Sequence, residues 1–144
     1  MSQHLVVDTS VVSKLYLRDE EWVANADALF ARFERGEVEL VAPRLITYEV
    51  PASIRNAIVK RRINEEDGQE AVAHFRRLPL PIIDDLDVLE EAFRTANRYS
   101  RSFYDSIFLV LAQDLGWNLV TADDKLWKPL HLKLPFLIHL RYLN

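Results

Sequence analysis

The sequence lacks cysteine altogether and has only three glycines among its 144 residues. Without cysteine the chain forms neither disulfides nor thiolate metal sites, and this composition fits the reducing cytosol. Glycine is too scarce for a flexible linker, and the chain has no low-complexity tract and no internal repeat. We therefore expect one domain spanning residues 1–144, long enough to bury most of its apolar surface.

Long apolar runs and an excess of positive charge are missing too. No stretch is long enough to span a membrane, and the N-terminus lacks the basic and then apolar segments of a secretion signal. We therefore expect a cytoplasmic location and no membrane partner. The formal net charge is −4, so binding of nucleic acid would require a local basic patch or a bound cation.

What the chain does contain is an alternation of short apolar strands with helical patterns. Strands that alternate with helices pair in parallel through right-handed crossovers. We predict an α/β protein, a three-layer α/β/α fold with a central, mostly parallel five-stranded sheet. Pro79 and Pro81 place the third strand at an edge, and Pro51 predicts a kink in a helix. The expected strands are residues 4–7, 38–42, 80–83, 118–121 and 136–140, and the expected helices are 11–17, 22–35, 44–62, 64–77, 87–100, 107–115 and 125–128.

Four acidic residues come from separate segments that this topology brings to one edge of the sheet. Asp8 and Asp123 directly follow buried strands, and the carboxyl ends of parallel strands share one edge. Asp105 begins the helix before the fourth strand and Glu49 lies early in the helix after the second, so both return to that edge. Each acid also has an ordinary interpretation: a helix cap, a first-turn residue, a turn residue, or a glutamate that reaches solvent.

Taken together, the four acids are hard to explain as ordinary surface residues. Two carboxylates about 4 Å apart repel by about 4 kcal/mol at an effective dielectric of about 20. Such a cluster persists only with raised pKa values or a bound cation. Ligands that are all oxygen, with no cysteine or histidine in the set, favour a hard cation, Mg²⁺ or Mn²⁺.

The segments around these acids resemble the PIN-domain nucleases, particularly the ribonuclease toxins of VapC-type toxin–antitoxin pairs. They match the family's order and spacing over the length of a single such domain. The matching pieces are Val6-Val7-Asp8-Thr9-Ser10, Tyr48-Glu49-Val50, Tyr104-Asp105-Ser106-Ile107 and Leu119-Val120-Thr121-Ala122-Asp123.

The resemblance implies an acidic metal site formed by Asp8, Glu49, Asp105 and Asp123, with Ser10 and Thr121 as supporting hydroxyls. Asp8, Asp105 and Asp123 would hold one or two Mg²⁺ or Mn²⁺ ions, and Glu49 would assist. Asp124 is a neighbouring acid that could share the fourth position, but the Thr-x-Asp spacing favours Asp123.

The implied activity is metal-dependent endoribonuclease hydrolysis of RNA that leaves 5′-phosphate and 3′-hydroxyl ends. The resemblance also implies a cognate antitoxin protein, whose C-terminal segment enters the acidic groove, and a homodimer. The clearest basic patch, formed by Arg55, Lys60, Arg61 and Arg62, is either an RNA contact or an ordinary solvated helix end.

Three alternatives stay open. The chain could be a stand-alone RNA-processing nuclease of the same fold, or a PIN-like domain that binds without cleaving. It could also be a phosphoacceptor receiver domain, which is likewise α/β with acids at the same edge. A receiver domain normally has paired acids after its first strand, whereas this chain has Asp8 alone there.

Overall fold

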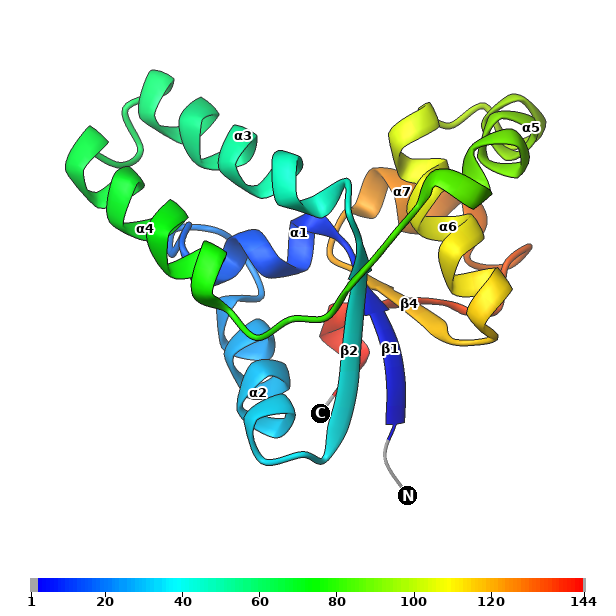
Figure 1. Ribbon diagram of the computed structural model, residues 1–144, viewed down its shortest axis with the longest axis horizontal. Helices are drawn as coiled ribbons and strands as arrows, with labels where there is room; N and C mark the ends of the chain where they lie inside the picture. Colours follow the sequence, from blue (N-terminus) through cyan, green and yellow to red (C-terminus); the bar gives the residue numbers. More distant parts are fainter. Residues whose placement is uncertain (1–2, 144) are drawn as a thin grey trace.

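Five short parallel strands form the sheet, in the order β3-β2-β1-β4-β5. The computed structural model describes residues 3–143 (Figure 1). The predicted five-stranded sheet is confirmed, with every strand pair parallel, and the third strand lies at an edge as its prolines indicated. The strands are β1 (Gln3–Val7), β2 (Val38–Pro43), β3 (Ile82–Ile83), β4 (Asn118–Thr121) and β5 (Leu137–His139).

Helices cover both sides of this sheet. In Figure 1, α2 and α6 lie on opposite sides of β1 and β2, and α6 contacts β1, β2 and β4. Helix α5 packs on α6, while α3 and α4 pack together and extend away from the sheet. The α-helices are α1 (Thr9–Val12), α2 (Val23–Glu34), α3 (Ile46–Val59), α4 (Glu65–Arg77), α5 (Leu89–Tyr99), α6 (Phe103–Leu115) and α7 (Asp124–Leu130), and short 3₁₀ turns are η1 (Ser13–Leu15), η2 (Leu86–Val88) and η3 (Leu140–Tyr142).

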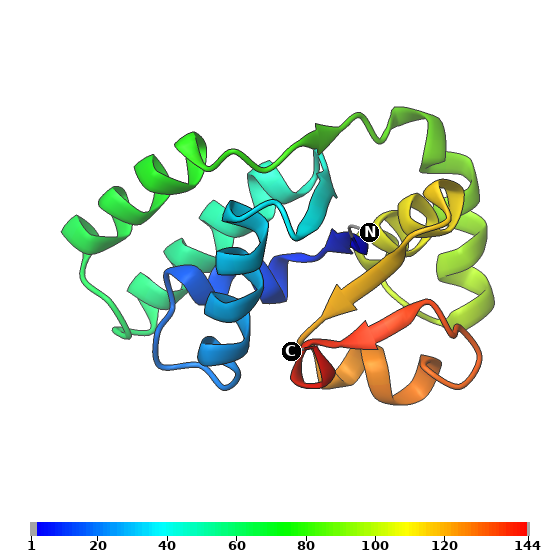
Figure 2. The same ribbon diagram turned by 90° about the horizontal axis from the view of Figure 1, so that it is seen from below.

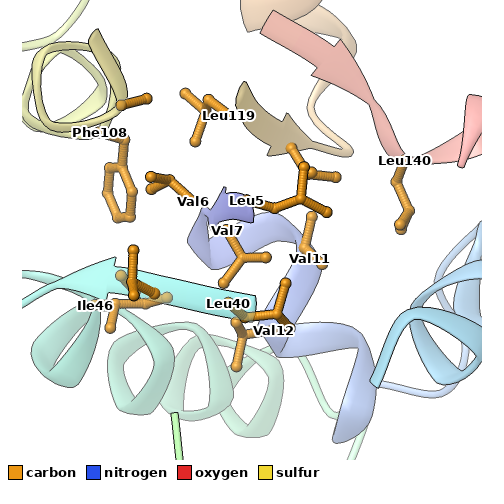
Figure 3. Close-up of a cluster of buried hydrophobic side chains, with 14 of the residues drawn as sticks. Leu5, Val6, Val7, Val11, Val12, Leu40, Ile46, Phe108, Leu119 and Leu140 are labelled. Carbon is orange, nitrogen blue, oxygen red and sulfur yellow. The ribbon is translucent and has the colours of Figure 1, made fainter. Parts of the chain in front are cut away.

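The core is centred on β1. Leu5, Val6 and Val7 are fully buried, because a central strand in a parallel sheet is covered on both faces. Val6 lies opposite Val41 of β2 and Leu119 of β4. Figure 3 shows side chains from α1, α3, α6 and η3 closing around these strands. The buried strands therefore hold β1 and β4 side by side, and with them their carboxyl ends.

Two local predictions were wrong in detail. The helix expected at 11–17 is split into α1 and the turn η1. Asp87 was expected to start a helix, but α5 begins two residues later, at Leu89, and no side chain caps it. Helix α3 is continuous through Pro51, and the kink expected there stays a prediction.

Within residues 3–143, no helix combines the length and the apolar character that crossing a membrane requires. The expected cytoplasmic location stays a prediction.

Candidate active site

A pocket of about 300 Å³ lies beyond the carboxyl ends of β1 and β4. All four predicted acids line it, so the convergence inferred from the strand and helix order is confirmed. Its walls come from the segment after β1, one face of α3, the first turns of α6 and the start of α7. The lining residues are Asp8, Thr9, Ser10, Glu49, Ala52, Ser53, Asn56, Asp105, Phe108, Asp123 and Leu126.

Asp8 is the most deeply buried of the four acids, with 7% of its surface exposed. It caps α1: its Oδ1 accepts hydrogen bonds from the Val11 amide at 3.3 Å and from Ser10 Oγ at 2.5 Å. Burial raises the pKa of Asp8 from 3.8 to about 7, and the negative charge of Asp123 adds to the rise. The hydrogen bonds oppose that rise, since they favour the ionised carboxylate.

Ser10 and Thr121 join the end of β1 to the end of β4. Ser10 Oγ accepts a hydrogen bond from the Ala122 amide at 2.8 Å and lies 3.3 Å from Thr121 Oγ1. Thr121 is fully buried, and its Oγ1 accepts from the Asp123 amide at 3.1 Å. The two hydroxyls predicted to support the site therefore lie where they set the spacing between Asp8 and Asp123.

Glu49 and Asp105 form the other side of the pocket. Thr9 Oγ1 donates to Glu49 Oε1 at 2.8 Å. The Asp105 amide donates to Ser102 Oγ at 3.0 Å, so Asp105 sits in a capped first turn of α6. Burial raises the pKa of both acids; the charge of Asp105 adds to the effect at Glu49, and that of Asp123 adds to it at Asp105.

The repulsion among these acids is not offset by a close cation. Within residues 3–143, none of the four takes part in an ion pair with lysine, arginine or histidine. Arg101 lowers the pKa of Asp105 only through a weaker, longer-range effect. The pocket is therefore a region of negative potential that a cation would stabilise.

The acids suit a metal ion by their chemistry more than by their present spacing. As placed, no three acidic or histidine side chains of residues 3–143 are close enough together to hold an ion. The donor set itself fits Mg²⁺ or Mn²⁺, because four carboxylates surround one pocket and hard divalent cations prefer oxygen ligands.

Asp123 and Asp124 point in different directions. Asp123 lines the pocket and caps α7 by accepting from the Lys125 amide at 3.0 Å. Asp124 does not line the pocket; its Oδ1 accepts from Arg141 Nη2 at 3.0 Å. The position favoured by the Thr-x-Asp spacing is thus the one that faces the pocket.

The predicted basic patch lies away from the acids. None of its residues lines the pocket. Arg55 lies in the second half of α3, and Lys60, Arg61 and Arg62 directly follow that helix. Arg62 is held by ion pairs to Asp19 and Glu20, at 2.8 and 3.1 Å. An RNA contact by this patch stays a prediction.

Three polar residues of the pocket were missed at the level of sequence. Ser53 and Asn56 stand four and seven residues after Glu49, so they continue the same face of α3 along the pocket wall. That helical spacing was the available signal. Thr9 was read only as part of a motif, and its hydrogen bond to a residue 40 positions away has no signature in one sequence.

Comparison with known proteins gives consistent matches. The family model described as PIN domain matches residues 5–128. Ribonuclease VapC12 of Mycobacterium tuberculosis is 30% identical over 122 residues, which cover 85% of this chain and 88% of the relative.

Solved structures share the fold. VapC20 of M. tuberculosis, titled a Sarcin-Ricin loop cleaving toxin, has a TM-score of 0.64 at 18% identity, covering 83% of this chain and 90% of the other. A toxin-antitoxin complex from Klebsiella pneumoniae has a TM-score of 0.60 at 17% identity, covering 97% and 99%.

Proposed function

Because this chain belongs to the PIN-domain family, we propose that it is a metal-dependent endoribonuclease and the toxin of a toxin–antitoxin pair. One observation carries the proposal: four carboxylates from four separate segments line one pocket, and no cation within residues 3–143 pairs with any of them. The ribonuclease name of the VapC12 relative supports the choice of reaction.

In this mechanism Asp8, Asp105 and Asp123 would hold one or two Mg²⁺ or Mn²⁺ ions. When bound, the ion supplies positive charge to the scissile phosphate and lowers the pKa of the attacking water. Burial raises the pKa of Asp8 to about 7, and a bound cation would favour the ionised carboxylate. Ser10 stabilises that carboxylate through its hydrogen bond to Oδ1.

Glu49 orients the attacking water. Its carboxylate accepts a hydrogen bond from Thr9. The negative charge of Asp105 contributes to raising the pKa of Glu49. Water rather than the ribose 2′-hydroxyl is the nucleophile, so the products carry 5′-phosphate and 3′-hydroxyl ends.

A cleavage assay with a matched variant tests the activity. Wild type, Asp105→Asn and Asp114→Asn are incubated with total bacterial RNA in Mg²⁺, Mn²⁺ or EDTA, and the new 5′ ends are mapped. Asp105→Asn should cut at least about a hundredfold more slowly, the scale expected when a group that stabilises developing charge is lost. Asp114 is an exposed acid of α6 outside the pocket, so Asp114→Asn should cut normally.

Three results would contradict the proposal. Cleavage by wild type at full rate in EDTA would remove the metal from the mechanism. Cleavage by Asp105→Asn at the wild-type rate would remove that carboxylate from it. A folded wild type that cuts no RNA in any metal would favour the PIN-like domain that binds without cleaving.

The same pocket suits a basic antitoxin segment. An arginine or lysine inserted among unpaired carboxylates forms charge-assisted hydrogen bonds, which are stronger than neutral ones. The solved complex from K. pneumoniae, titled toxin-antitoxin, supports a partner of this class. We also propose a homodimer, since Tyr48, Leu86 and Phe93 are large apolar residues with over 60% of their surface exposed.

Expression from the native locus tests both assemblies. We expect the chain to co-purify with a small basic-tailed protein and light scattering to give a toxin dimer in the complex. Wild type expressed alone should arrest growth, and Asp8→Asn should not. Normal growth with no co-purifying protein would instead indicate a stand-alone RNA-processing nuclease, and a monomeric mass would contradict the dimer.

A further inference from the structure

The last strand and turn of the chain lie beside the start of α7. The family match ends at residue 128, before β5 and η3 begin. In the sheet, His139 of β5 is the register partner of Thr121, two residues before Asp123. Figure 2 shows the C-terminal turn next to α7. This segment therefore adjoins the backbone that carries the fourth acid of the pocket.

Asp124 is the residue that the C-terminal segment holds. Arg141 Nη2 donates to Asp124 Oδ1 at 3.0 Å, and His139 Nε2 lies 3.2 Å from the same oxygen. His139 is fully buried, and its Nδ1 accepts from the Arg141 amide at 3.0 Å. The neutral imidazole thus carries its proton on Nε2, which lies near Asp124 but makes no hydrogen bond within residues 3–143.

Arg141 is itself held in place by aromatic rings. Its guanidinium carbon lies 5.5 Å from the ring centroid of Trp22, 5.1 Å from that of Trp127 and 5.4 Å from that of Tyr142. Three rings around one guanidinium restrict its rotamers and favour the cation in this position. The arginine is therefore a preorganised anchor for Asp124.

Anchoring Asp124 fixes the neighbouring carboxylate. Asp123 is bonded through its amide to Thr121 and through Oδ1 to the Lys125 amide, so the backbone at 123–124 is set by β4, by α7 and by Arg141. A displacement of about 1 Å at a reacting centre can cost about a hundredfold in rate. We propose that Arg141, held among the Trp22, Trp127 and Tyr142 rings, is a positioning residue that keeps Asp123 facing the pocket through Asp124.

This inference rests on the proposed metal site, and Mn²⁺ binding tests it without a turnover assay. Mn²⁺ affinity is measured by calorimetry on wild type, Arg141→Gln and Asp124→Ala, which removes the oxygen that accepts from Arg141. Each variant should bind Mn²⁺ about tenfold more weakly, the effect typical of groups that orient a ligand from behind. The double variant should lose little more, because the two residues act as one unit. In RNA cleavage, kcat should fall while KM stays near its wild-type value.

A matched control separates positioning from stability. Arg18→Gln removes another arginine–aspartate pair, whose two bonds to Asp27 measure 2.8 and 2.6 Å, outside the pocket. It should bind Mn²⁺ as wild type does. Wild-type Mn²⁺ affinity in both Arg141→Gln and Asp124→Ala would overturn the positioning role and leave the metal site standing. The Asp124 side chain is partly exposed, so Asp124→Ala leaves no buried cavity and decides the question if Arg141→Gln fails to fold.

Failure of the metal site itself would look different. Asp123→Ala should abolish most Mn²⁺ binding in the same measurement. A wild type that binds no Mn²⁺, or an Asp123→Ala variant that binds it equally well, would overturn the site and with it the positioning role.

Discussion

At the scale of single residues, the sequence predicted which acids meet but not how each is held. The positions of Asp8 and Asp123 after buried strands were enough to place both in one pocket. Their partners depend on side-chain direction, which strand and helix order do not specify. The adjacent Asp123 and Asp124 show this best, because one faces the pocket and the other faces Arg141.

The buried Asp8 should make the metal-free protein less stable as pH rises. Its pKa is about 7 in the folded protein against 3.8 ordinarily, so the folded state binds more protons between these values. The free energy of unfolding should therefore fall from about pH 4 to pH 7, by on the order of 3–4 kcal/mol from this group. Asp8→Asn should remove that slope and be more stable than wild type at pH 8.

Urea unfolding in EDTA at several pH values measures the effect. Asparagine is also a preferred helix cap, so the variant keeps the bond to Val11. Parallel pH profiles for wild type and Asp8→Asn would show that burial does not perturb this carboxyl.

At the scale of elements, some capping residues in the sequence predicted a helix start correctly and one did not. Ser102 and Asn64 each cap a helix by accepting from the amide three residues on, at 3.0 and 2.7 Å. Asp87 had similar spacing and caps nothing, because the chain makes the turn η2 there first. The residue type therefore does not show whether a position caps a helix. At Asp87 the outcome depends on the route of the chain from β3 to α5. The two-residue β3 is likewise set by pairing with β2 rather than by its own pattern.

The caps of α6 and α4 form a matched pair for mutation. Ser102→Ala and Asn64→Ala should each lower the free energy of unfolding by about 1 kcal/mol. Only Ser102→Ala should also slow RNA cleavage, because Asp105 lies in the turn that loses its cap. Equal cleavage rates in the two variants, measured well below their melting temperatures, would show that Asp105 does not depend on this cap.

At the scale of the whole molecule, alternation of strands and helices predicted the parallel sheet, but not the strand order. Order depends on which crossover packs on which face, and many orders satisfy the same alternation. The sequence also gave no sign that the C-terminal segment contacts the region of the pocket. Arg141 donates a hydrogen bond to Asp124, 17 positions earlier, and no local pattern predicts such a contact. Because the pocket is lined by four acids, we expect the stability of the protein to depend on divalent cations.

Divalent cations should stabilise the whole fold. At a free concentration 100 times the dissociation constant, a ligand specific for the folded state adds about 2.7 kcal/mol, on the order of 10 °C in melting temperature for a chain of this size. Mn²⁺ should therefore raise the melting temperature of wild type and of Asp114→Asn, and much less that of Asp8→Asn. The same rise in all three proteins would mean that the cation binds elsewhere.

The strand order also has a consequence for synthesis. The ribosome makes β1 first, yet one of its two neighbours in the sheet, β4, begins only at Asn118. A nascent chain that ends before β4 carries Asp8, Glu49 and Asp105 but has neither the strand that completes the pocket nor the acid that follows it. The nuclease we propose therefore has no assembled pocket until the ribosome has made β4 and Asp123, and it cannot cut RNA before that point of its own synthesis.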